Sequence, residues 1–156
     1  MPGAVHDFLS RDHERLDALL ARADVDPAAY AEFRAGLMRH IAMEEKVLLP
    51  EAKRLRGGEP LPIAKQLKAD HAALASLLVP PPTPALVATI RSLLGEHNPL
   101  EEGDAGMYAA CEALIGSEAD RVLEAMRAVP PVRASAHLDE PRIHDHIARM
   151  LEARRR

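Results

Sequence analysis

Four stretches of this chain repeat apolar residues at intervals of three and four positions, the spacing that places side chains on one face of an α-helix. In an ordinary helical bundle such a stripe consists of aliphatic residues only. Here every stripe contains a histidine, and two stripes also carry a glutamate four positions later. The polar residues on the four stripes are His13, His40, Glu44, His71, His97 and Glu101.

Proline and glycine residues divide the sequence into helical segments. Strong helix formers predominate and aromatic residues make up only 3% of the chain, a composition typical of helices rather than strands. Pro50 should kink its helix or start a new turn, and Gly103 and Gly106 should make the fourth helix irregular. We expect helices over residues 5–23, 28–55, 62–78, 84–128 and 142–153.

Four long amphipathic helices with short connections predict an all-α fold, an up-down four-helix bundle. The chain has 156 residues, enough for one domain with a substantial core. We assign residues 1–128 to the bundle and residues 129–156 to a C-terminal extension with a short helix. The exposed faces show no heptad pattern, so the sequence leaves the oligomeric state open.

Charge and cysteine content exclude several classes of protein. The net charge of −4 gives no reason to expect binding to nucleic acid or to an anionic membrane surface. The single cysteine, Cys111, rules out an internal disulfide framework and a cysteine-rich zinc or iron–sulfur site. No apolar segment approaches the ~20 residues of a membrane span, and no signal peptide is visible. The sequence therefore predicts a cytoplasmic protein.

The two halves of the sequence resemble each other when residues 12–52 are aligned with residues 70–110. An Asp-His pair begins each half, and a His-x-x-x-Glu-Glu motif follows it. The two histidines of each half are separated by 27 positions (13 to 40) and 26 positions (71 to 97). Two helical hairpins of one design should therefore assemble with approximate two-fold symmetry, each contributing a lone histidine and a His-x-x-x-Glu pair to a shared interior.

The two glutamates on the stripes indicate a metal site. A buried carboxylate without a partner costs several kcal/mol, and no lysine or arginine lies on the opposing stripes to pair with Glu44 or Glu101. A lone histidine on an apolar face is usually structural, but four in repeated register, two with a glutamate one turn later, favour coordination. Nitrogen and oxygen ligands without thiolate suit iron, manganese or zinc. We expect two metal ions with the glutamates bridging them.

These residues also resemble a known family. The resemblance covers about residues 5–128 and is carried by Asp12-His13-x-x-Leu16, His40-x-x-x-Glu44-Glu45-x-x-Leu48-Leu49-Pro50, Asp70-His71-x-x-Leu74 and His97-Asn98-Pro99-x-Glu101-Glu102. At these motifs the chain looks like a member of the hemerythrin-like family, also called the HHE cation-binding domain. The resemblance implies a four-helix bundle around two non-haem irons, with the four histidines as terminal ligands and the two glutamates as bridges. It also implies binding, sensing or storage of dioxygen, nitric oxide or iron.

The sequence departs from the oxygen-carrying members of that family at two places. Those proteins have a second histidine on the third helix, one turn after the first, where this chain has Ala75. They also place an aspartate five residues after the last histidine, where this chain has Glu101 at four. One iron would then have an open position, which also permits an oxidoreductase acting on peroxide or dioxygen. A structural or regulatory helical module with zinc or no metal is a further alternative.

Several polar residues lie outside the proposed ligand set. His6 lies two turns before His13, and we expect it at the surface, with a place beside the ligands as the alternative. His137, His144 and His146 of the extension are expected at the surface. Glu45 and Glu102 should face solvent or hydrogen-bond the ligands. Tyr30 and Tyr108 could line a route for a small ligand, although packing accounts for them equally well.

Overall fold

The computed structural model describes residues 3–156, and these residues form helices and no strand. The all-α prediction is confirmed. The α-helices are α1 (Ala4–Ala21), α2 (Pro27–Met43), α3 (Leu49–Leu55), α4 (Ala64–Leu77), α5 (Pro84–Glu102), α6 (Met107–Ile115), α7 (Ala119–Arg127) and α8 (Pro141–Arg154). A π-helical turn, Glu44–Leu48, joins α2 to α3, and a 3₁₀ turn, Gly116–Glu118, joins α6 to α7.

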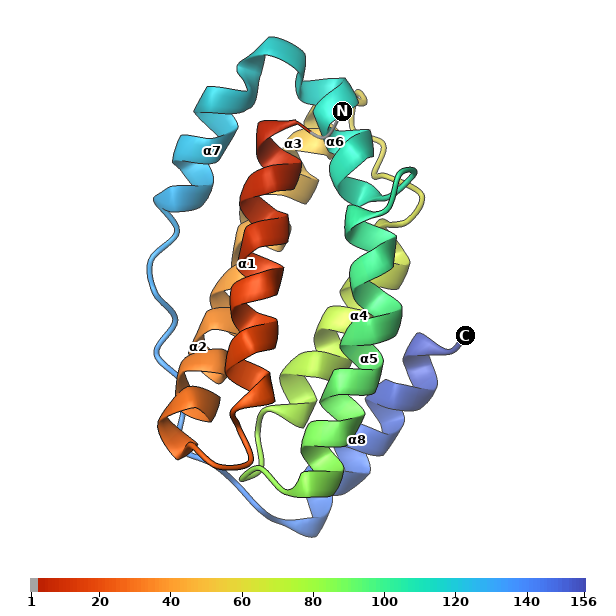
Figure 1. Cartoon of the computed structure of the whole chain (residues 1–156). Helices are drawn as coiled ribbons and strands as arrows, with labels where there is room; N and C mark the ends of the chain where they lie inside the picture. Colours follow the sequence, from red (N-terminus) through yellow and green to blue (C-terminus); the bar gives the residue numbers. More distant parts are fainter. Residues whose placement is uncertain (1–2) are drawn as a thin grey trace.

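Two antiparallel hairpins build the bundle (Figure 1). The first consists of α1 and α2, which continues through the π turn into α3, and the second consists of α4 and α5, which continues into α6. The hairpins meet where α1 packs against α5 and α6, and where α3 packs against α6. Each hairpin begins its second helix with a capping side chain and a proline. Asp26 accepts a hydrogen bond from the Ala28 amide at 3.0 Å, and Thr83 accepts one from the Leu86 amide at 3.1 Å.

The apolar core is divided into two clusters along the bundle. One cluster contains Leu9 of α1 and Leu67 of α4. The other contains Leu16 of α1 and Leu74 of α4. On α1, His13 lies between Leu9 and Leu16, and on α4, His71 lies between Leu67 and Leu74. A polar layer therefore crosses the bundle between the two apolar clusters. The apolar clusters on both sides of this layer fix its height in the bundle.

Pro50 produces a wider helical turn than a simple kink. Its missing N–H and its ring disturb the preceding turn, and the Leu49 amide donates to the carbonyl of Glu44, five residues back. The resulting π turn contains both Glu44 and Glu45. Single π turns often occur at functional sites because they change the direction of side chains within a helix. The sequence predicted a disturbance here but not its form.

The predicted helix over residues 84–128 is not continuous, and this expectation was wrong in one respect. The irregularity expected near Gly103 and Gly106 is present: a Cβ on Gly106 would lie 2.6 Å from the Glu101 carbonyl oxygen, so the turn requires glycine. A second break at Gly116, where φ is +57°, was not expected. Beyond it α7 turns back and packs against α1 and the π turn.

The C-terminal segment returns along the outside of the bundle and ends in α8, which packs against α4 (Figure 1). Two arginines of α2 hold the connecting segment by its carbonyl oxygens. Arg39 donates to the carbonyl of Val129 at 3.0 Å, and Arg34 donates to that of Ser135 at 2.6 Å. Ile147 of α8 is buried against the second apolar cluster. The expected helix at 142–153 is therefore present, while the division into a 1–128 domain and an extension stays a prediction.

Among residues 3–156, no helix is both long enough and apolar enough to cross a lipid bilayer.

Candidate metal centre

The structure brings all six stripe residues together in the polar layer. Glu44 and Glu101 are fully buried, and the four histidines are between 2% and 7% exposed. Two groups have ligand atoms close enough to share an ion. The first subsite consists of His13, His40, Glu44 and Glu101, and the second consists of His71, His97 and Glu101. Buried clusters of histidine and glutamate of this kind are suited to metal binding.

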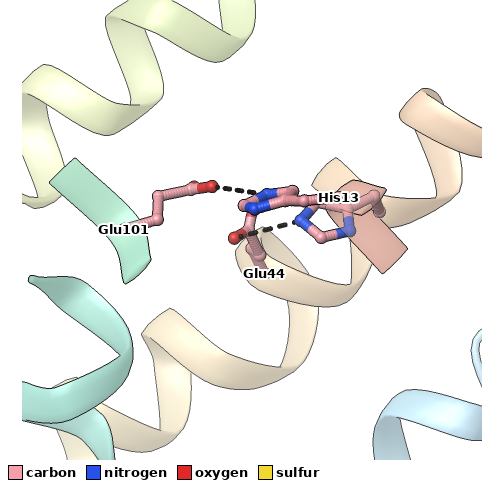
Figure 2. A group of neighbouring side chains, drawn as sticks. His13, Glu44 and Glu101 are labelled. Carbon is pink, nitrogen blue, oxygen red and sulfur yellow. Dashed lines mark ion pairs between the residues drawn. The ribbon is translucent and has the colours of Figure 1, made fainter. Parts of the chain in front are cut away.

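Each glutamate presents its two oxygens to different histidines. Glu101 Oε1 lies 3.1 Å from His13 Nε2, as Figure 2 shows. Its other oxygen, Oε2, lies 3.0 Å from His97 Nε2 and 3.3 Å from that of His71.

Glu44 is arranged in the same way. Its Oε2 lies 3.5 Å from His40 Nε2, and its Oε1 lies 3.2 Å from His71 Nε2. This second oxygen is buried, and among the described residues it has no hydrogen-bond partner. A buried carboxylate oxygen in that state is unfavourable unless a cation satisfies it, so the residues fit a bound metal.

A second carboxylate holds the outer nitrogen of every imidazole in the centre. In each contact the histidine Nδ1 donates to the carboxylate, which leaves Nε2 directed into the centre. The pairs are His40 with Asp12 at 2.8 Å, His97 with Asp70 at 2.8 Å, His71 with Glu45 at 2.7 Å and His13 with Glu102 at 3.3 Å.

These pairs follow the internal repeat. The two aspartates hold a histidine of their own hairpin, whereas Glu45 and Glu102 hold a histidine of the other hairpin. The approximate two-fold symmetry expected from the sequence is thus present in the contacts around the centre. Of the two positions expected for Glu45 and Glu102, the structure shows the second: both side chains hydrogen-bond a histidine of the centre.

The carboxylates dominate the electrostatics of the metal-free centre. Burial acts to lower the pKa of His40, but Glu44 and Asp12 outweigh it and raise that pKa to about 10. Burial likewise acts against the charged form of His97, yet Asp70 and Glu101 raise its pKa to about 9. Protons on these imidazoles stand in for the positive charge that metal ions would supply.

For His71 and Glu101, too, contacts with oppositely charged groups outweigh the effect of burial on the pKa. Burial opposes the charged His71, but its contacts with the carboxylates of Glu101, Glu44 and Glu45 raise its pKa to about 12. For Glu101, burial acts to raise the pKa, and its contacts with His13, His71 and His97 bring it well below the usual range. The centre therefore holds Glu101 in its ionised form.

Tyr108 of α6 reaches into the centre itself, whereas the sequence offered it only as a residue that could line a route for a small ligand or pack in the core. Its hydroxyl oxygen donates to Glu44 Oε2 at 2.7 Å and lies 3.2 Å from Glu101 Oε1. Burial and the two carboxylates keep its pKa well above the usual value, so the hydroxyl is neutral here. Tyr108 lies seven residues after Glu101, which is a helical spacing, but the irregularity expected at Gly103 and Gly106 interrupts the stripe between them, so the sequence did not place it among the ligands.

Four other residues can be compared with the sequence expectations. His6, for which the sequence favoured the surface over a place beside the ligands, is half-buried, and its Nε2 donates to the carbonyl oxygen of Glu102 at 2.8 Å. This contact buttresses the end of α5 where Glu101 and Glu102 lie. His144 and His146 are exposed, as expected. Ala75, at the position of the missing third-helix histidine, has no ligand atom, so α4 offers the second subsite one histidine, His71.

A pocket of about 390 Å³ between α1 and α5 reaches the edge of the centre. His13 and Glu102 line its inner end, with Leu94, Gly95 and Asn98 among the other lining residues. His13 is also the most exposed of the four histidines, at 7% against 2% for the others. Solvent and small molecules therefore approach the centre from the His13 side.

Comparison with known proteins supports the same reading of these residues. Searches of curated proteins and of solved structures found no match. Residues 4–111 match the family described as Hemerythrin HHE cation binding domain, a span that includes all six stripe residues, the four carboxylates around them and Tyr108. On this match, and as the sequence motifs suggested, the chain belongs to the hemerythrin HHE cation-binding domain family.

Proposed function

We propose that this protein is a non-haem di-iron protein that binds, senses or stores a small ligand, dioxygen or nitric oxide, or that stores iron. The observation that carries the proposal is the placement of the two glutamates. Each has one oxygen directed at the first subsite and the other directed at histidines of the second. Carboxylates placed in this way suit two adjacent ions better than one.

Each group of residues would have its own role in holding a di-iron centre. The four imidazoles would each supply one terminal nitrogen, and Glu44 and Glu101 would bridge the ions. The outer carboxylates would fix the imidazole tautomers and raise their basicity. Bound iron supplies reversible electron transfer and open positions for a diatomic ligand. The second subsite supports ligand uptake because no side chain replaces the histidine missing at Ala75.

The test is to load the protein with iron without oxygen and to measure metal content, Mössbauer spectra and absorption before and after dioxygen or nitric oxide is added. We expect two irons per chain and absorption changes that depend on the added gas. If iron binds but its spectra do not change with either gas, the protein does not bind a diatomic ligand, and iron storage is the remaining form of the proposal. Protein from iron-replete cells that holds zinc, manganese or no metal would contradict the iron assignment.

A second candidate function, an oxidoreductase acting on peroxide or dioxygen, is favoured by the open position that the histidine missing at Ala75 would leave at one iron. An iron with an open position can react with a substrate as well as bind it. Steady-state consumption of peroxide that disappears in His97→Ala, but not in the exposed control His144→Ala, would support it. Stoichiometric oxidation without turnover would remove this alternative.

A further inference from the structure

The hydroxyl oxygen of Tyr108 has a distinctive position in the first subsite. It lies 2.7 Å from Glu44 Oε2 and 3.2 Å from Glu101 Oε1. It also lies 3.2 Å from Nε2 of His13 and 3.2 Å from Nε2 of His40. One phenol oxygen is thus within 3.2 Å of a ligand atom from every residue of the first subsite.

These separations are those of neighbouring ligands around one ion. With metal–ligand bonds of about 2.1 Å, two donors at right angles are about 3.0 Å apart. The Tyr108 oxygen therefore lies where a fifth donor to the same ion would lie. We propose that Tyr108 is the fifth protein ligand of the first subsite, binding the metal through its hydroxyl oxygen as phenolate. This inference rests on the proposed function because it requires a metal at the first subsite.

The charge of the direct ligands is consistent with this assignment. Among the residues that would contact the two ions, only Glu44 and Glu101 are anionic, so a phenolate would add a third negative charge in direct contact with the metal. The step involves no change of oxidation state. The phenol O–H bond breaks, its proton leaves to solvent as the metal binds, and an oxygen–metal bond forms in its place. Without metal the hydroxyl keeps its proton and donates to Glu44.

Tyr108 would also make the two metal ions unequal. The internal repeat places Glu51 at the equivalent position of the first hairpin, and Glu51 pairs with Arg54 and Arg121 at the protein surface instead. The second subsite consequently has no tyrosine. With Tyr108 bound, the first ion is nearly saturated by protein ligands, so a small exogenous ligand would bind at the second ion.

The chain offers a sharp test because it contains only two tyrosines. The other, Tyr30, is buried in the second apolar cluster and packs against Phe33, away from the centre. We expect the full-length ferric protein to show a phenolate-to-iron charge-transfer band in the visible and tyrosinate ring modes in its resonance Raman spectrum. Both should persist in Tyr30→Phe and be lost, per bound iron, in Tyr108→Phe.

A second measurement removes the dependence on Tyr108→Phe folding or loading normally. Tyr30→Phe protein contains Tyr108 as its one remaining tyrosine, so ring-deuterated tyrosine incorporated into that variant must shift the Raman modes. Two bound irons without tyrosinate modes, or modes that survive in Tyr108→Phe, would overturn the assignment and leave the di-iron proposal intact. Failure of the wild type to bind iron would overturn the di-iron proposal itself.

Discussion

At the scale of single residues, the carboxylates outside the ligand set are as informative as the ligands. The stripe pattern identified all six residues that meet in the centre, because helical spacing places them on buried faces. It did not identify Asp12 or Asp70 as partners of histidines, although the Asp-His pairs were visible in the repeat. Which residue of a neighbouring helix an aspartate contacts depends on helix packing, and sequence spacing within one helix does not encode that.

Removal of an outer carboxylate should weaken metal binding without removing a ligand. In Asp12→Ala the His40 Nδ1 loses its acceptor at 2.8 Å, so the imidazole is less basic and less fixed in orientation. We expect metal affinity about 10–100-fold lower, measured by competition with a chelator. Asp17→Ala is the matched control, since Asp17 is exposed on the same helix. Equal affinity in both variants would show that the Asp12 contact has no role in metal binding.

The raised histidine pKa values give the metal-free protein a defined dependence on pH. In the folded protein the pKa values of His97 and His40 are about 9 and about 10, above the usual histidine value of 6.5. Their stabilisation is therefore fully present below pH 6.5 and is lost as the pH rises through about 9 to 10.

We expect the melting temperature of the metal-free protein to fall across that interval, followed by circular dichroism. The metal-loaded protein should change less, because metal replaces the protons. A metal-free protein whose stability stays flat from neutral to alkaline pH would contradict the ion pairs described here.

At the scale of secondary-structure elements, the helices and most of their ends follow from the sequence. Pro27, Pro84 and Pro141 each lie at the start of a helix, where proline is tolerated. The break at Gly116 could not be predicted, since a single glycine within an apolar helix does not by itself indicate a positive φ. The π turn was equally hidden, because the choice between a kink and a widened turn depends on how the two apolar clusters pack around it.

Helix α8 is connected to the centre by one arginine. Arg154 Nε lies 2.8 Å from Asp70 Oδ1, on the opposite side of that carboxylate from His97, and Arg154 is largely buried. In the first hairpin the equivalent aspartate, Asp12, pairs with Arg15, whose side chain is 49% exposed. In the second hairpin, Arg154 of α8 thus does for Asp70 what the exposed Arg15 does for Asp12 in the first.

Loss of Arg154 should therefore be costly compared with loss of Arg15. Arg154→Ala leaves the buried Asp70 without its cation, and we expect a loss of about 1–3 kcal/mol in the free energy of unfolding. Arg15→Ala removes an exposed pair and should cost about 0–1 kcal/mol. Urea unfolding of the two metal-free variants measures the difference. A smaller effect for Arg154 would mean that Gln66 and His97, which also contact Asp70, satisfy it alone.

At the scale of the whole molecule, the centre joins four helices from two hairpins, so its occupation stabilises the bundle as a unit. A ligand that binds only the folded state raises the free energy of unfolding by about 2.7 kcal/mol when its concentration is one hundred times its dissociation constant. We expect iron to raise the melting temperature and a chelator to reverse the change. His71→Ala should reduce the rise, and the exposed His146→Ala should not. A melting temperature indifferent to metal in the wild type would argue against a site within the bundle.

The exchange of Glu45 and Glu102 between the hairpins has a consequence for how such a protein can change over generations. Each hairpin needs a glutamate of the other hairpin to orient its lone histidine. A substitution at one of these glutamates therefore changes the histidine of the opposite hairpin. Two identical hairpins related by a two-fold axis would supply every one of these contacts. A single hairpin that self-associates about such an axis would therefore orient its lone histidines in the same way.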